Sequence, residues 1–311
     1  MQEFLITLDI MLPILFLLIL GWLLRKWGLM KDPVSSGMNQ LVFKVFLPLL
    51  IFDNIRSLDL SSPPKASLSV FMAVSILAIF SVAKLVTPRL VPDPRKNGVI
   101  VQAISRTNFA ILGSALMMNM FGEAGMATFS LAMPIVIPLF NVLAVIALSG
   151  TGGKVNVRQT LYKIVTNPLI LAVVAGLVFM FLKIPLPNAV GKAINQLGGL
   201  SSPVSLLVLG ASLRWEGVRD NRKELFFTVL VRQLFLPCTM IAIAALLGFR
   251  DIDLGVLIIL FGAPVAVSSY PMAVGMGGDK DLAAGILVLS TVTSMGTLFL
   301  LIYLCKLFAF I

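Results

Sequence analysis

The chain has 311 residues, of which 59% are hydrophobic and 12% charged, whereas soluble domains contain about 25% charged residues. This composition excludes a soluble globular protein. In a soluble protein the net charge of +10 would suggest a nucleic-acid partner. Here the Lys and Arg residues lie in short loops between apolar runs. In that position basic residues set membrane topology, and no nucleic-acid partner is expected.

The apolar runs have the length of membrane-spanning helices. A spanning helix needs about 20 apolar residues, and the runs approach that length with short polar loops between them. We therefore predict an all-α integral membrane protein with ten transmembrane helices. The predicted spans are residues 7–24, 38–55, 68–86, 98–121, 124–148, 164–182, 193–213, 225–247, 254–275 and 282–308.

The basic residues predict how these spans are oriented. If the N-terminus lies outside, the inward segments hold 15 Lys and Arg residues and the outward segments hold six. Cytoplasmic loops carry an excess of Lys and Arg. Both termini are therefore expected outside.

The sequence also indicates an internal duplication. A shift of 155 residues aligns Pro or Gly at four positions, each in an equivalent predicted helix. The pairs are Pro13 with Pro168, Gly21 with Gly176, Pro48 with Pro203, and Gly122 with Gly277. We predict a first five-helix repeat at 1–150, a cytoplasmic linker at 151–158 and a second repeat at 159–311. Because each repeat has an odd number of helices, the second is inverted relative to the first.

Two predicted spans are interrupted at matching positions. The fourth contains the polar run 105–108, and the ninth contains Pro264 and Pro271, which each remove a backbone hydrogen bond. At the same offset, Phe109 falls on Pro264 and Ser114 falls on Ser269. Transporters built from repeats bind substrate where such broken helices meet. Helices 4 and 9 are therefore predicted to cross at a substrate site.

The candidate substrate-binding residues all come from these two segments. They are Arg106, Thr107, Asn108, Gly113, Ser114, Pro264, Ser268, Ser269, Tyr270 and Pro271. A purely structural role is the alternative, since Pro and Gly are common in membrane helices and Ser and Thr often bond within or between helices. The pairing of both segments at one repeat position favours the functional interpretation.

Three cations fall well inside predicted spans, away from their ends. An Arg or Lys at the bilayer centre costs at least about 2.5–3.5 kcal/mol and usually marks a cavity or pathway. Arg106 lies at the inferred crossing and is the best candidate for binding an anion, while Lys44 and Arg232 either support the site or pair within the protein. The chain has no His and no Asp or Glu clearly at mid-membrane. No residue is therefore assigned to proton or sodium coupling, and no metal or cofactor is expected.

Several sequence blocks resemble one known family in their order along the chain. They are 38–52, which includes Leu47-Pro48; Asn167-Pro168-Leu169-Ile170; Leu209-Gly210-Ala211-Ser212-Leu213; Ser269-Tyr270-Pro271; Gly277-Gly278-Asp279; and Leu282-Ala283-Ala284. Together they cover nearly the whole chain. They resemble the bacterial branch of the auxin efflux carrier family, which includes malate/malonate-type permeases.

This resemblance implies an inverted-repeat fold shared with bile acid symporters and sodium/proton antiporters, with a scaffold part and a transport part that move against each other. Asn108 matches the Asn at the crossover of the plant auxin carriers, and Pro264 matches the proline of their ninth helix. Those carriers usually have a proline where Ala115 stands. The first crossover is therefore expected to be less sharply broken, held open by Asn108 and Gly113.

The implied function is secondary transport of a small organic anion, expected to be a carboxylate, by alternating access. The location implied is the bacterial cytoplasmic membrane, with the lipid bilayer as surroundings. A channel or a membrane receptor for the same ligand class stays open as an alternative, and so does the oligomeric state, for which a homodimer is one option. An enzyme is not expected, because the chain lacks His, a Gly-x-Ser-x-Gly motif and paired membrane Asp residues.

Overall fold

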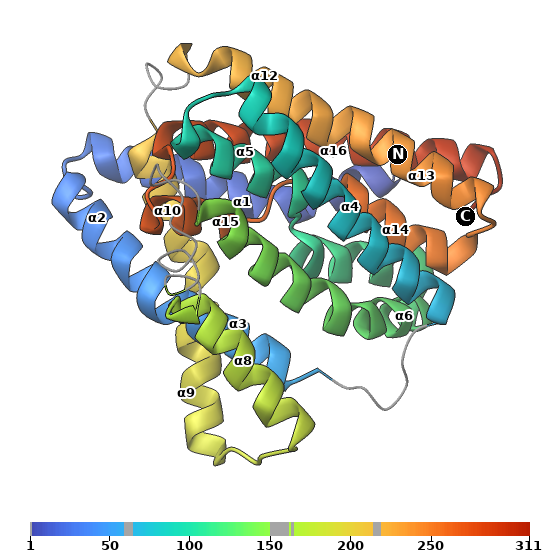
Figure 1. The fold of residues 1–311 in the computed structure, drawn as a ribbon, viewed down its shortest axis with the longest axis horizontal. Helices are drawn as coiled ribbons and strands as arrows, with labels where there is room; N and C mark the ends of the chain where they lie inside the picture. Colours follow the sequence, from blue (N-terminus) through green and yellow to red (C-terminus); the bar gives the residue numbers. More distant parts are fainter. Residues whose placement is uncertain (1, 59–64, 150–161, 163–164, 214–218) are drawn as a thin grey trace.

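The computed structural model describes residues 2–58, 65–149, 162, 165–213 and 219–311 (Figure 1). Every named element in this part of the chain is a helix, which confirms the predicted all-α class. The predicted linker at 151–158 lies outside the described residues. Both ends of the chain lie at the same end of the helix bundle in Figure 1.

The helices follow the predicted spans closely, and several spans consist of more than one helix. The first repeat region contains α1 (Gln2–Lys26), α2 (Asp32–Leu41), η1 (Val42–Phe46), α3 (Leu47–Arg56), α4 (Ala66–Leu90), α5 (Pro94–Ser105) and α6 (Phe109–Leu148). The second contains α8 (Pro168–Phe181), α9 (Asn188–Gly199), α10 (Ser201–Ser212), α12 (Arg222–Leu230), η2 (Val231–Phe235), α13 (Leu236–Leu246), α14 (Asp251–Gly262), α15 (Ser269–Gly275) and α16 (Lys280–Leu307).

Five stretches of helix among the described residues are long and apolar enough to cross a membrane. They are Asp32–Arg56, Ala66–Leu90, Leu116–Leu148, Arg222–Leu246 and Lys280–Leu307, and Pro168–Phe181 is a shorter apolar helix. Predicted span 98–121 is divided between α5 and the first part of α6, and predicted span 254–275 is divided between α14 and α15. Predicted span 7–24 lies within the 25-residue helix α1. The chain is thus a multi-pass membrane protein, and its other predicted spans are short or interrupted.

Two π-helical turns, η1 and η2, each come directly before a Leu-Pro pair. Pro48 and Pro237 have no N–H group, and a proline ring clashes with the carbonyl four residues earlier. The turn before each proline therefore widens. Lys44 lies in the widened turn η1, and Arg232 lies in the widened turn η2.

The helices pack in two groups. The first helix group consists of α1, α2, η1, α3, α8, α9 and α10, within which α1 packs on α10 and α3 packs on α8 and α9. The second helix group consists of α4, α5, α6 and α12 to α16. In Figure 1, α3, α8 and α9 extend together beyond the body of the second group. Contacts of α1 with α16 and of α15 with α2 join the two groups.

Glycines allow the closest approaches within the first helix group. A Cβ added to Gly21 of α1 would stand 2.2 Å from the carbonyl oxygen of Leu207 in α10. A Cβ on Gly176 of α8 would stand 3.2 Å from the carbonyl oxygen of Phe52 in α3. At the 155-residue offset, Gly21 corresponds to Gly176 and Leu207 to Phe52. The same kind of contact therefore occurs twice, and each time it joins a helix of one half of the chain to a helix of the other half.

Gly122 and Gly277, the last pair matched in the sequence, also share a conformation. Their φ angles are 62° and 81°, in the left-handed region that favours glycine. Gly122 interrupts the helical backbone within α6, and Gly277 lies between α15 and α16. Each one turns the chain after an interrupted helix.

Candidate functional site

The two interrupted helices meet at their breaks. Helix α5 ends at Ser105 and α6 begins at Phe109, while α14 ends at Gly262 and α15 begins at Ser269. Thr107 and Val265 form an antiparallel bridge, and the Asn108 N–H donates to the Pro264 carbonyl at 2.8 Å. The non-helical segments 106–108 and 263–268 thus pair with each other, and we call them the crossover. The first break is the shorter of the two.

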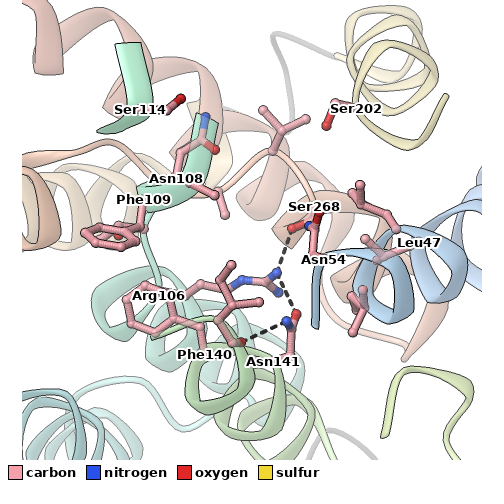
Figure 2. A pocket seen from close by; sticks show the side chains of 17 residues that line it. Leu47, Asn54, Arg106, Asn108, Phe109, Ser114, Phe140, Asn141, Ser202 and Ser268 are labelled. Carbon is pink, nitrogen blue, oxygen red and sulfur yellow. Dashed lines mark hydrogen bonds between the residues drawn. The ribbon is translucent and has the colours of Figure 1, made fainter. Parts of the chain in front are cut away.

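A cavity of about 370 Å³ lies beside the crossover, with walls from both helix groups (Figure 2). Its polar lining residues are Asn54, Arg106, Thr107, Asn108, Ser114, Asn141, Ser202 and Ser268. Its apolar lining residues are Leu47, Leu50, Ile51, Phe109, Ala110, Ile137, Phe140, Ala266 and Val267. The cavity therefore offers both hydrogen-bonding groups and an apolar wall.

Arg106 supplies the only formal charge among these lining residues. Its side chain is held by neutral acceptors: Nη2 donates to Oδ1 of Asn141 at 2.9 Å and to Oγ of Ser268 at 2.8 Å. Asn141 in turn donates from Nδ2 to the Ile137 carbonyl at 2.9 Å, which turns its oxygen toward Arg106. None of the ion pairs found in the described residues includes Arg106. A buried cation without a carboxylate partner is thus fixed at the cavity wall.

Several polar groups at the cavity make no hydrogen bond within the described chain. The Thr107 hydroxyl is buried and unpartnered. Asn108 stands at the N-cap of α6, where an Asn side chain usually bonds the helix's own N–H groups, but it makes no such bond. Asn54 and Ser202 also line the cavity with no side-chain bond in this part of the chain. Because buried polar groups normally have partners, the buried side chains of Thr107 and Asn108 in particular are available to a ligand.

The other predicted site residues have different surroundings. Gly113 lies inside α6, beyond the break, where an added Cβ would stand 2.4 Å from the Phe129 ring. Ser269, Tyr270 and Pro271 are buried in the first turn of α15 and are not among the cavity-lining residues.

The two further cations also lie outside the lining. Lys44 is exposed on η1 and is not among the cavity-lining residues. Arg232 is buried and bonds the backbone of α14.

Sequence reasoning missed three polar lining residues: Asn54, Asn141 and Ser202. Ser202 and Leu47, which correspond at the 155-residue offset, both line the cavity, and each one directly precedes a matched proline, Pro203 or Pro48. That pairing could have directed attention to Ser202. Asn141 is a lone amide in an otherwise apolar predicted span, which is a weaker signal.

Apolar helices that break and meet beside an internal polar cavity define the architecture of a membrane transporter. The chain belongs to the membrane transport protein family, whose model matches residues 6–302. This is the auxin efflux carrier family that the sequence blocks resemble. The family and its members' names are those of transporters and not of enzymes.

Three relatives match over nearly their full length. An uncharacterized transporter of Methanothermobacter thermautotrophicus is 23% identical over 93% of this chain and 95% of its own. An uncharacterized transporter of Methanocaldococcus jannaschii is 23% identical over 93% of this chain and 96% of its own. A protein of Rhizobium meliloti named "Putative malonate transporter" is 21% identical over 96% of this chain and 95% of its own.

Proposed function

We propose that this protein is a secondary transporter of a small organic anion, specifically a carboxylate, and that it works by alternating access. The observation that carries the proposal is Arg106, a buried cation held by Asn141 and Ser268 at the wall of a cavity beside two broken helices. Cations at such depth are costly and usually mark a transport pathway. A bound carboxylate would neutralise this charge.

The first turn of α6 adds a second attraction for an anion. The N–H groups of a helix's first turn have no partners within the helix, and the helix dipole places about half a positive charge there. Phe109 and Ala110, the first two residues of α6, line the cavity. Asn108 leaves these N–H groups uncapped. A carboxylate at this point would accept hydrogen bonds from the backbone and from Asn108 and Arg106.

The size of the cavity and the relatives suggest which carboxylates to try first. A volume of about 370 Å³ suits a small organic acid, since drug-sized ligands occupy pockets of about 300–1,000 Å³. The R. meliloti relative is named for malonate. Malonate and malate are therefore the first probes, and acetate and indole-3-acetate test a smaller and a larger anion.

The ten-span inverted repeat is part of the proposal. It is supported by the contact of Gly21 with Leu207 and its counterpart of Gly176 with Phe52. The positive φ angles of Gly122 and of Gly277, which follows the second interrupted helix, add to this support. In such a fold both termini share one side of the membrane, and the basic loops favour the outer side.

Alternating access is supported by the position of the cavity between the two helix groups. Asn54, in the last turn of α3, is exposed and lines the cavity, so the cavity is reachable from that end. Toward the other end, Gly275 of α15 packs against the Phe43 ring of η1. With the predicted topology, this arrangement is an outward-facing state. Inward opening would then require Gly275 and Phe43 to separate as one group moves against the other.

Uptake into proteoliposomes tests the proposal. Purified protein is reconstituted, and uptake of radiolabelled malonate or malate is measured against protein-free vesicles and against vesicles holding the Arg106→Gln variant. We expect saturable uptake by the parent that is accelerated when unlabelled substrate is present inside the vesicles. Conductance that does not saturate would favour a channel, and binding without flux would favour a receptor. Failure of all four carboxylates to bind or cross would contradict the carboxylate assignment.

A further inference from the structure

The buried guanidinium of Arg232 has no place in the cavity and needs another explanation. It is 1% exposed, its Nη1 donates to the Phe261 carbonyl at 2.7 Å, and its Nη2 donates to the Ala263 carbonyl at 2.7 Å. Both acceptors stand where α14 ends, at Gly262. As with Arg106, none of the ion pairs in the described chain includes it.

The Arg232 guanidinium bonds the carbonyl end of α14. The last carbonyls of a helix have no partners within the helix, and they carry about half a negative charge. At a break inside the protein, those carbonyls need a donor, and their charge would repel an anion bound nearby. Arg232 satisfies two carbonyls and opposes that charge. We propose that Arg232 is a positioning residue of the anion site, acting through the backbone of the crossover.

The local sequence holds Arg232 in this place. It lies in η2, the widened turn that precedes Pro237. The neighbouring Gln233 is fixed by Thr297 of α16, whose hydroxyl donates to Oε1 of Gln233 at 3.3 Å. Helix α13 also packs on α14. The turn that carries Arg232 is therefore bonded to α16 through Gln233, and the guanidinium reaches the break of α14.

A continuous series of contacts leads from Arg232 to the cavity. Ala263, whose carbonyl it holds, begins the non-helical segment 263–268. Within that segment Pro264 accepts from Asn108, Val265 pairs with Thr107, and the Val265 N–H also donates to the Ser290 hydroxyl at 3.3 Å. The segment closes with Ser268, which accepts from Arg106. This last link rests on the proposed function, since it assigns Arg106 to the ligand.

Hydrogen exchange of the crossover amides tests the inference without any ligand. Arg232→Gln removes the charge and at least one of the two bonds, so the Asn108 and Val265 N–H groups should open more often. A hydrogen bond to a charged group is strong enough that its loss raises opening about ten-fold or more. We expect exchange of peptides covering 106–108 and 263–268 to accelerate by about that factor.

Arg250→Gln is the matched control. Arg250 is exposed, and its Nη1 donates to the carbonyls of Ala245 and Phe249 at 2.7 Å, so it also serves a helix end but lies outside the crossover. Its replacement should leave crossover exchange unchanged. Arg232→Lys keeps the charge but has one donor group, so we expect an intermediate acceleration of crossover exchange. This variant replaces Arg232→Gln in the test if Arg232→Gln does not fold. Parent-like exchange of the crossover in a folded Arg232 variant would overturn the inference.

Malonate affinity then tests whether the effect reaches the ligand. In Arg232→Gln we expect malonate to bind about ten-fold more weakly, with partial recovery in Arg232→Lys and no loss in Arg250→Gln. A variant with fast crossover exchange but parent-like malonate affinity would refute the link to the anion site. If the parent itself does not bind malonate, the proposed substrate fails, whereas the exchange measurement still decides the role of Arg232.

Discussion

Replacing Arg106 by Gln removes the one charge that lines the cavity. Hydrogen bonds to charged groups contribute about 1.5–3 kcal/mol, and each 1.4 kcal/mol is about a ten-fold change in affinity. The dissociation constant of a bound carboxylate should therefore rise about 10- to 150-fold. The change also leaves Asn141 and Ser268 without their donor, although removing an unpaired buried cation offsets part of that cost. The free energy of unfolding, followed as the melting temperature, should therefore fall by less than the free energy of carboxylate binding does.

The assay is isothermal titration of purified protein with the tightest-binding carboxylate, together with thermal unfolding of the free protein. Arg250→Gln serves as the control, because it removes an arginine that bonds two carbonyls far from the cavity. Arg106→Lys should bind with intermediate affinity, since it keeps the charge but loses the planar arrangement of donors. Folded Arg106→Gln protein that binds as tightly as the parent would refute the assignment of Arg106 to the ligand.

Asn108→Ala should weaken carboxylate binding about five- to hundred-fold, because a ligand group loses its partner, while Ser149→Ala, whose hydroxyl bonds its own helix, should leave titration curves unchanged. Gly21→Ala forces a Cβ onto the Leu207 carbonyl and should cost about 1–3 kcal/mol of stability; a melting temperature equal to that of Gly296→Ala would contradict this packing. Reporter fusions should place both termini outside, and a cytoplasmic C-terminus would rule out the inverted five-plus-five arrangement. Transport should persist when potassium or choline replaces sodium, and its abolition would reveal a sodium site.

Much of the fold could be predicted because the relevant signals are local. Apolar run length predicted the helices, and prolines and polar residues predicted the breaks at 106–108 and 263–268. The π-helical turns could not be predicted with the same ease. They depend on how the chain around Pro48 and Pro237 accommodates a missing hydrogen bond, which packing decides.

The candidate site was predicted in part, for a similar reason. Arg106 and Asn108 stand out in sequence because polar groups in an apolar span are costly. Asn54 and Ser202 come from helices of the other group, and only the packing of α3 and α10 against the crossover brings them to the cavity. Lys44 and Arg232 looked alike in sequence, yet one is exposed and the other is buried against α14.

The most direct test of the account is a structure of the protein determined with its tightest-binding carboxylate. We expect ligand density between α3, α10 and the crossover, with a carboxylate group next to Arg106, Asn108 and the first turn of α6. Density at any other location, with the cavity beside Arg106 unchanged, would contradict the claim that this cavity is the transport site.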